Sequence, residues 1–256
     1  MRLGLDHVAA GLARLLPVRL RAPVLRRLRL AIWAGRRVEC PCCERSFHAF
    51  LVPDPGRLNA VCPWCGSHVR HRVLWLFLRE RTDLFTRRAR LLHIAPEHVL
   101  QERLRARPNL EYVSADLESP LATEHFDITE VPHPDDSFDV ILCSHVLEHV
   151  PDDRRAMSEL HRVLAPDGWA ILQVPIDYSA DTVEDPAITT PEERERAYGQ
   201  ADHLRMYGND FPRRLEEAGF EVTVDPYLLS LPPAEVKRYG LVSLENMFVC
   251  RKGTGR

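Results

Sequence analysis

The chain has 256 residues and a mass of 29.4 kDa, enough for one full α/β domain with a small appended module. Hydrophobic residues make up 45% of it and charged residues 28%, which excludes an intrinsically disordered chain. No apolar run without charges approaches the roughly 20 residues that span a bilayer. Arginines interrupt the first thirty residues, which argues against a signal peptide and favours a cytoplasmic location.

The first 38 residues are strongly basic. They carry nine arginines and one acidic residue, a net charge of +8, so that the remainder of the chain carries −11. Apolar residues recur among these arginines at helical spacing: Leu12, Leu15, Leu16, Leu20, Leu25, Leu28 and Ile32. The pattern predicts a basic amphipathic arm over residues 1–38, broken at Pro17 and Pro23. Such an arm suits either peripheral contact with an anionic membrane or packing on the acidic remainder, whereas nucleic acid is less favoured by that acidic body.

Two CxxC pairs follow the arm. Five of the seven cysteines lie between residues 40 and 65, and 18 residues separate the two pairs. Each CxxC makes a tight turn that directs two thiolates at one tetrahedral centre. The spacing therefore predicts a zinc ribbon over residues 39–69, with the ligands Cys40, Cys43, Cys62 and Cys65. Disulfides are disfavoured by the odd number of cysteines.

Four protein ligands leave the predicted zinc ion no open position, so its role is structural and it stabilises a segment too short for a core of its own. The stretch between the pairs predicts two short strands around residues 54–56. Cys42 is then the spare thiol, although it could exchange with a neighbouring cysteine. His48 and His68 are possible substitute ligands.

The remaining residues alternate between two periodicities. Residues 70–89 predict a linking helix. Beyond residue 90, strands are predicted over 91–95, 110–115, 138–143, 168–174, 220–224 and 246–250, and helices over 97–107, 152–164 and 210–218. This alternation predicts an α/β fold with a mainly parallel, doubly wound sheet, which binds ligands at the carboxyl ends of its strands.

Polar loops follow the first predicted strands of this sheet, at residues 93–97, 116–118 and 126–128. A carboxylate after the second strand, here Asp116, is placed to accept hydrogen bonds from a ribose diol. The next acidic loop, at Asp127, suits the amine of an adenine ring.

Four segments of the chain resemble a known family. They are DITEVP at residues 127–132, DSFDVIL at 136–142, HVLEHV at 145–150 and ELHRVLAPDG at 159–168. Together they resemble the class I S-adenosylmethionine-dependent methyltransferases, with the small-molecule branch as the nearest match, over residues 90–256. The resemblance implies a seven-stranded Rossmann-like sheet with an antiparallel final strand. It also implies methyl transfer from S-adenosylmethionine to an oxygen, nitrogen or carbon of a small-molecule or glycan-type acceptor.

The resemblance also assigns cofactor contacts. Asp116 would hold the ribose hydroxyls and Asp127 the adenine amine, with Ile128 beside it, while Ser144 and His145 would line the cofactor after the fourth strand.

The first loop departs from the family pattern. The family has Asp-x-Gly-x-Gly there, whereas residues 93–97 contain no glycine. His93, Ala95 and Glu97 of this loop are still expected beside the cofactor. Glu97 could bond the cofactor's amino group but would repel its carboxylate.

Four titratable residues are candidates for the chemistry. His145, Glu148 and His149 have the i, i+3, i+4 spacing of one helical face, and His203 lies in a polar segment further on. His149 or His203 could act as the general base. Alternatively all four could hold a divalent metal, as a similar pattern does in small-RNA 2′-O-methyltransferases. A third interpretation gives Glu148 and His149 a capping and packing role only.

An acid-rich insertion occupies residues 176–207, with a helix expected over 191–198. Such an insertion after a strand can fold over the cofactor as a lid and form the acceptor pocket. Asp202, Arg205 and Tyr207 are the predicted acceptor contacts, because they concentrate charge and hydrogen-bonding groups within six residues of chain.

Two other functions stay open at this point. An RNA methyltransferase could use the ribbon and the basic arm to hold its substrate. A non-catalytic scaffold could combine a partner-binding ribbon with a degenerate sheet that has lost the cofactor.

Overall fold

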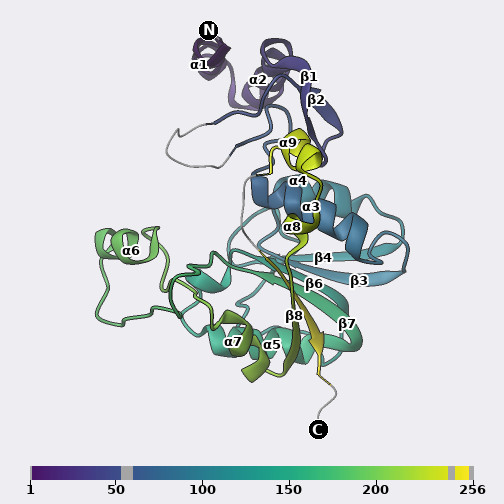
Figure 1. Ribbon diagram of the computed structural model, residues 1–256, viewed down its shortest axis with the longest axis vertical. Helices are drawn as coiled ribbons and strands as arrows, with labels where there is room; N and C mark the ends of the chain where they lie inside the picture. Colours follow the sequence, from purple (N-terminus) through teal and green to yellow (C-terminus); the bar gives the residue numbers. More distant parts are fainter. Residues whose placement is uncertain (1, 53–59, 242–245, 254–256) are drawn as a thin grey trace. The chain divides into compact units, whose positions relative to one another are not determined.

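The computed structural model describes residues 2–52, 60–241 and 246–253 (Figure 1). Its contacts divide the chain into two compact units. The ribbon unit consists of Met1–Thr82 and Tyr227–Leu244, and the sheet unit of Asp83–Pro226 and Glu245–Arg256. The second segment of the ribbon unit lies inside the range predicted as methyltransferase domain, so the contacts divide the chain differently from the predicted boundary at residue 90.

The sheet unit contains one seven-stranded sheet. Its elements in chain order are β3 (Ala89–Ile94), α4 (His98–Arg105), β4 (Leu110–Asp116), β5 (Glu124–His125), β6 (Phe138–Ser144), η1 (Leu147–His149), α5 (Asp153–Val163), β7 (Leu164–Gln173), α6 (Pro191–Tyr198), α7 (Phe211–Glu217), β8 (Phe220–Asp225) and β9 (Met247–Lys252). The strand order is β5-β4-β3-β6-β7-β9-β8. The first five of these strands pair in parallel, and β9 runs antiparallel to both β7 and β8. The predicted doubly wound sheet with an antiparallel final strand is therefore confirmed.

Helices cover both faces of this sheet, with α5 and α7 on one face and α4 on the other (Figure 1). Helix α5 shows how the sequence determines this packing. Its fully buried residues recur at helical spacing: Ala156, Met157, Leu160 and Val163. Asp152 caps its N-terminus by accepting a hydrogen bond from the backbone N–H of Arg155 at 2.9 Å.

Strand β7 is longer than predicted, because it begins at Leu164 and not at residue 168. Gly168 lies inside it, where a Cβ atom would come within 2.8 Å of the carbonyl oxygen of Asp139. The close approach of two backbones explains why glycine stands at this point of a buried strand.

The ribbon unit contains two further strands and five helices among its described residues. They are α1 (Arg2–Arg14), α2 (Val18–Ile32), β1 (Ala34–Cys40), β2 (Arg45–Phe47), α3 (Val69–Arg81), α8 (Tyr227–Ser230) and α9 (Pro233–Tyr239). Strand β1 starts inside the predicted arm and pairs antiparallel with β2 around the first CxxC pair. Leu51 and Val61 form a bridge, but the predicted turn at residues 54–56 lies outside the described residues.

The basic arm is a pair of helices joined at Pro17. Pro17 precedes α2, as predicted, but the prediction of a second break at Pro23 was wrong, because Pro23 lies inside α2. Asp6 of α1 joins the pair: it accepts hydrogen bonds from Arg29 at 2.9 and 3.1 Å and from Trp33 at 3.3 Å. None of the described helices combines the length and apolar character that a bilayer span requires.

A buried arginine explains why residues 227–244 belong to the ribbon unit. Arg72 of α3 donates hydrogen bonds to the carbonyl oxygens of Tyr239 and Gly240, both at 2.9 Å, and to that of Ser67 at 2.8 Å. Its guanidinium also lies 4.0 Å from the ring centre of Phe50. A charge that is fully buried requires such partners, and the last residue of α9 and the residue after it supply two of them.

Candidate functional site

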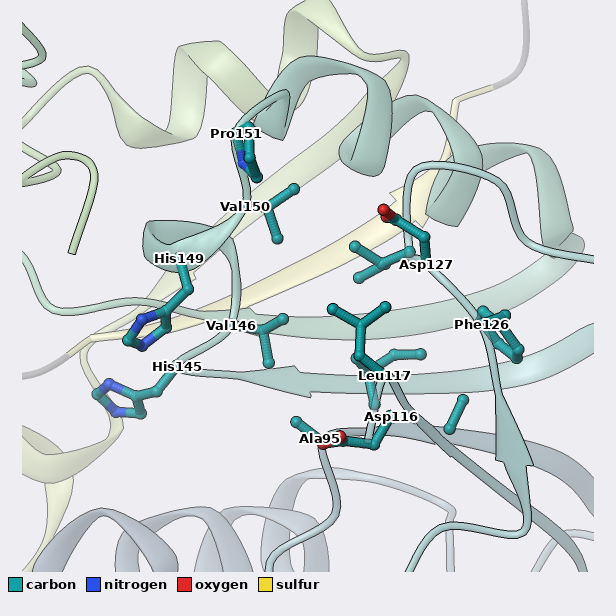
Figure 2. Close-up of a pocket in the computed structure, with 13 residues that line it drawn as sticks. Ala95, Asp116, Leu117, Phe126, Asp127, His145, Val146, His149, Val150 and Pro151 are labelled. Atoms are coloured by element: carbon teal, nitrogen blue, oxygen red, sulfur yellow. The ribbon is translucent and has the colours of Figure 1, made fainter. Parts of the chain in front are cut away.

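A pocket of about 250 Å³ lies at the carboxyl ends of β3, β4 and β6 in the sheet unit (Figure 2). Parallel strands end at the same edge, which brings three loops together there. The residues that line this strand-end pocket are Ile94, Ala95, Ala115, Asp116, Leu117, Phe126, Asp127, Ile128, His145, Val146, His149, Val150 and Pro151. Most of its lining is apolar, and its polar groups are two carboxylates and two imidazoles.

The two carboxylates share one arrangement. Asp116 Oδ1 accepts hydrogen bonds from the backbone N–H groups of Glu118 and Ser119 at 2.9 and 2.8 Å. Asp127 Oδ1 accepts two at 2.8 Å, from the N–H and the hydroxyl of Thr129. Each loop therefore holds its carboxylate through one oxygen, and no described residue bonds the other oxygen, which can accept a ligand's hydroxyl or amine.

The backbone is strained where two of the loops begin. Ala95 has φ 45° and His145 has φ 57°, both in the left-handed region that glycine adopts easily. Ala95 is held there by a hydrogen bond from its N–H to the carbonyl oxygen of Ala115 at 2.8 Å, and His145 by one to Gln173 at 2.8 Å. The first loop, which contains no glycine, thus makes the left-handed turn with an alanine, the residue with the smallest side chain after glycine.

Three residues that were predicted beside the cofactor do not line the pocket. His93 is 1% exposed and lies between two partners: its Nε2 is 2.9 Å from Glu97 Oε2 and its Nδ1 2.9 Å from the Tyr112 hydroxyl. Glu97 is therefore paired with His93. Ser144 ends β6 and is half-buried, outside the lining residues. The sequence could not show this pairing, because His93 and Glu97 meet across a turn.

The histidine cluster differs in geometry from its prediction. Glu148 and His149 lie on a single 3₁₀ turn, and His145 precedes it in a left-handed conformation, so the three do not share the face of one α-helix. His203 of the insertion nevertheless joins them, since its ring centre lies 4.8 Å from that of His149.

Within this cluster the two imidazoles differ in exposure. The His149 side chain is 34% exposed and lines the pocket, whereas His203 is 2% exposed and lies outside the lining. His203 Nδ1 is 3.0 Å from the carbonyl oxygen of Tyr198, and His149 Nδ1 is 3.3 Å from that of Asp202. These contacts leave Nε2 of both rings for other partners.

Glu148 has an unusual environment for a carboxylate. It is 1% exposed and neither side-chain oxygen has a hydrogen-bond partner among the described residues; His145 Nδ1 lies 3.4 Å from Oε1. One ligand atom each from Glu148, His149 and His203 lie within 4.8 Å of one another. The chemistry of this donor set suits a divalent ion, with the histidines held by backbone carbonyls.

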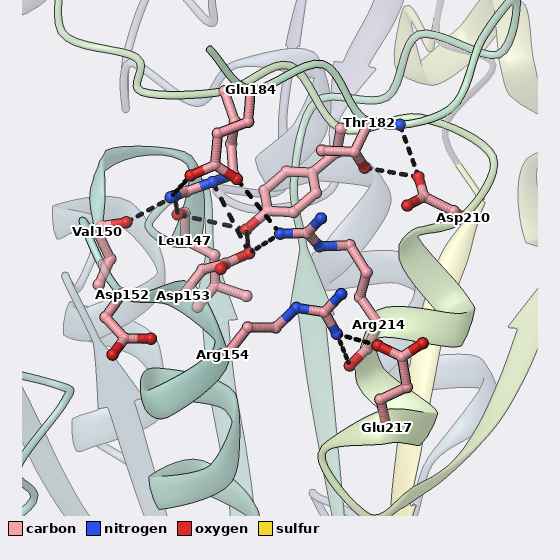
Figure 3. Close-up of polar contacts among 12 residues, drawn as sticks. Leu147, Val150, Asp152, Asp153, Arg154, Thr182, Glu184, Asp210, Arg214 and Glu217 are labelled. Atoms are coloured by element: carbon pink, nitrogen blue, oxygen red, sulfur yellow. Dashed lines mark hydrogen bonds and ion pairs between the residues drawn. The ribbon is translucent and has the colours of Figure 1, made fainter. Parts of the chain in front are cut away.

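The insertion is held to the pocket by buried polar contacts (Figure 3). Arg205 is 1% exposed and donates to the carbonyl oxygens of Leu147, Val150 and Pro151 at 2.8, 2.6 and 3.0 Å, and to Glu184 at 2.7 Å. These carbonyls belong to the segment that forms one wall of the strand-end pocket.

Tyr207 is fully buried, and its hydroxyl donates to Asp153 Oδ2 at 2.7 Å. Burial, followed by the charge of Asp153, raises its pKa. Arg205 and Tyr207 therefore hold the insertion in place and do not line the strand-end pocket, contrary to their predicted role as acceptor contacts. Asp202 remains 70% exposed, with Oδ2 3.3 Å from His149 Nδ1.

Sequence reasoning missed the apolar walls of the pocket. Leu117, Phe126, Val146 and Val150 line it, together with Pro151. Their position in the sequence could have identified them, because each lies in or beside a loop already identified by its polar residues.

The four predicted zinc ligands meet in the ribbon unit. Their sulfur atoms lie within 4.8 Å of one another, with Cys40 Sγ 3.6 Å from Cys65 Sγ and Cys43 Sγ 3.7 Å from Cys62 Sγ. Four thiolates about 2.3 Å from a central zinc ion lie about 3.8 Å apart. The donor set and its spacing thus fit a tetrahedral metal ion.

Cys42 lies outside this cluster. Its side chain is fully buried, and its thiol donates to the carbonyl oxygen of His71 at 3.6 Å. Burial raises its pKa well above the usual value, which favours the protonated, non-ligating form.

Part of this chain resembles known proteins. Residues 77–172 match the family model described as "Methyltransferase domain". The chain is 31% identical over 128 residues to 27-O-demethylrifamycin SV methyltransferase of Amycolatopsis mediterranei, covering 48% of this chain and 43% of that protein. It is 32% identical over 98 residues to a probable S-adenosylmethionine-dependent methyltransferase of Mycolicibacterium smegmatis, covering 38% and 34%. The matches span less than half the length of either relative.

Among solved structures, the cyclase SpnF aligns with a TM-score of 0.50 and 17% identity, covering 81% of this chain and 88% of that one. At this identity the likeness concerns the fold alone, and that neighbour is named for a cyclisation. The reaction must therefore be argued from the site and not from the fold.

Proposed function

Residues 77–172 belong to the class I S-adenosylmethionine-dependent methyltransferases, and from this premise we propose that the protein methylates a small-molecule acceptor at the strand-end pocket. The observation that carries the proposal is the pair of carboxylates in that pocket, each with one oxygen held by its own loop and the other without a bond among the described residues. A nucleoside presents the complementary groups, namely a diol, an exocyclic amine and a flat apolar ring.

The residues of the pocket fit the cofactor. Asp116 would accept hydrogen bonds from the ribose hydroxyls, and Asp127 from the adenine amine, with Ile128 against the ring. When bound, S-adenosylmethionine supplies a methyl group on a positively charged sulfur. The chain's own contribution is to exclude water and align the acceptor, as the apolar walls at Val146 and Val150 support.

We assign the general base to His149. Its ring lines the pocket, and the contact of Nδ1 with the backbone and side chain of Asp202 favours a proton on Nδ1 and a free lone pair on Nε2. If the acceptor is a hydroxyl, Nε2 would take its proton as the methyl group is transferred. His203 is less suited to this role, because it is 2% exposed, lies outside the pocket lining and packs its ring edge-on against that of His149.

A divalent ion on Glu148, His149 and His203 is the second candidate for this cluster. It is favoured by the buried carboxylate of Glu148, both of whose oxygens lack a hydrogen bond. Ligands about 2.1 Å from one ion lie roughly 3.0–3.4 Å apart, so the three side chains, whose ligand atoms lie within 4.8 Å of one another, would draw closer around it. Chelation under conditions that spare the cysteine-bound zinc distinguishes the two: it abolishes turnover only if this second ion takes part, and magnesium or manganese then restores it.

We further propose that Cys40, Cys43, Cys62 and Cys65 hold a structural zinc ion. The geometry of the four sulfur atoms supports this, as does the fully buried Cys42 beside them. With four thiolate ligands the ion has no position for substrate, so it would contribute to folding alone.

Calorimetry tests the cofactor first, with S-adenosylmethionine and its demethylated product titrated into the full chain. A methyl-transfer screen over metabolite and RNA pools then identifies the acceptor class. Heat of binding and label in a metabolite support the proposal. Label in RNA favours an RNA methyltransferase instead, and no heat at about millimolar ligand favours the scaffold interpretation.

A further inference from the structure

Helix α1 and Leu15, the residue directly after it, expose an apolar stripe. Leu5, Val8, Leu12 and Leu15 are 49%, 59%, 57% and 82% exposed. Their spacing of three and four residues places them on one helical face. Ala9 and Ala13 are buried on a different face, toward the interior of the ribbon unit. Four large apolar side chains left in a row on a helix surface indicate an interaction face.

Helix α2 adds to this apolar surface. Leu20 and Leu28 are 44% and 38% exposed, and Val24 lies between them at the same four-residue spacing, half-buried. None of the described residues of α2 is fully buried. The two helices of the arm therefore both leave apolar side chains uncovered.

The charge around these side chains has one sign. Residues 1–38 contain nine arginines and one acid, and that acid, Asp6, is neutralised inside the helix pair by Arg29. In the helix pair, the exposed arginines are Arg14, Arg19, Arg21 and Arg27, and in β1 they are Arg36 and Arg37. The pair of helices thus combines exposed apolar side chains with a net positive charge.

We propose that the α1–α2 pair docks on the surface of an anionic lipid bilayer. The leucines would enter the boundary between headgroups and acyl chains, and the arginines would meet the lipid phosphates. A nucleic acid would match the arginines but leave the leucine stripe exposed to water. The bilayer is the partner whose chemistry matches both features, and it would bring the methyltransferase to acceptors held at or near a membrane.

Sedimentation of the full chain with vesicles tests this docking. Vesicles of phosphatidylcholine with about 30% phosphatidylglycerol present anionic headgroups, and pure phosphatidylcholine vesicles do not. We expect binding to the anionic vesicles, at least tenfold less to the neutral ones, and a marked loss of binding at about 0.5 M salt.

Two variants distinguish membrane binding through the leucine stripe from non-specific hydrophobic adsorption. The double variant Leu12→Asp and Leu15→Asp should lose at least tenfold in partitioning. The matched control is Leu229→Asp, which changes a 76% exposed leucine outside the helix pair and should partition like the wild type. All three side chains are exposed, so circular dichroism should show an unchanged fold.

Three outcomes would overturn the proposal: no sedimentation of the wild type with anionic vesicles, equal sedimentation of the double variant, or equal loss in the control. The measurement involves no S-adenosylmethionine. Its failure is therefore distinguishable from failure of the cofactor calorimetry.

Discussion

Ala95 shows how a single residue can replace a glycine-rich loop. Its backbone enters the left-handed region at φ 45°, which costs an alanine about 1 kcal/mol and a β-branched residue more. The hydrogen bond from its N–H to Ala115 keeps this turn at the end of β3, where it forms part of the strand-end pocket.

Because of this geometry, cofactor binding should depend on the shape of the side chain at position 95 and not on its polarity. We expect Ala95→Gly to bind the demethylated cofactor as the wild type does, because glycine adopts the same φ without strain. Ala95→Val should weaken binding by about tenfold or more, as its branched side chain disfavours that φ. Calorimetry measures both variants, and wild-type affinity in the valine variant would show that the turn does not shape the site.

Asp116 is the most direct test of the cofactor site. Replacing it by alanine should weaken binding of S-adenosylmethionine by about 1.5–3 kcal/mol, the loss expected for charge-assisted hydrogen bonds to a diol. The control is Glu118→Ala, which removes an exposed carboxylate two residues away that does not line the pocket. Equal losses in both variants would point to a general charge effect.

The two histidines of the cluster should separate in kinetics. His149→Ala should lower turnover by about 10²–10⁴, with cofactor affinity nearly intact, if it removes the acceptor's proton. His203→Ala should act less strongly, because this buried ring supports His149 and does not line the pocket. A larger loss in the His203 variant, together with sensitivity to chelators, would favour the divalent ion.

At the scale of elements, buried polar contacts join the insertion to the rest of the sheet unit. Arg205 joins it to three carbonyl oxygens of the segment that follows β6, and Tyr207 joins it to Asp153 at the start of α5. Since that segment carries His149, the contacts that hold the insertion also position the proposed base.

Removing Arg205 should therefore destabilise the sheet unit. Arg205→Met should lower the free energy of unfolding by about 3–5 kcal/mol, because three carbonyl oxygens and the Glu184 carboxylate lose a donor and buried Asp153 loses an ion-pair partner. Arg213→Met is the control, since that side chain is 66% exposed and its loss should cost under about 0.5 kcal/mol. Denaturant unfolding measures both, and similar values for the two would refute the role of Arg205.

At the scale of the whole molecule, the two units should respond differently to loss of metal. Purified protein should contain close to one zinc ion per chain, and Cys62→Ser should lose it together with the folded ribbon unit. Cys42→Ala is the matched control, because that thiol is buried outside the cluster and should leave the zinc content unchanged. Elemental analysis and circular dichroism give the readouts, and a well-folded wild type without metal would contradict the proposal.

Much of this protein follows from its sequence by itself. Alternating periodicities predicted six of the seven strands of the sheet, all but the two-residue β5, and the CxxC spacing predicted which four cysteines meet. Asp116 and Asp127 could be identified as candidate site residues from the sequence. Asp116 directly follows a predicted strand and Asp127 lies in the next acidic loop, and parallel strands bring such loops together. In all these cases a local pattern is enough, because geometry over a few residues determines the outcome.

Only the tertiary structure decided which partner each buried polar side chain takes. Glu97 turned to His93 and away from the pocket, Arg205 and Tyr207 became internal contacts, and His203 came to lie behind His149. Residues 227–244 likewise joined the ribbon unit because Arg72 needed their carbonyls. A buried polar group must find a partner wherever the fold brings one within reach, and that partner can lie more than a hundred residues away in the chain.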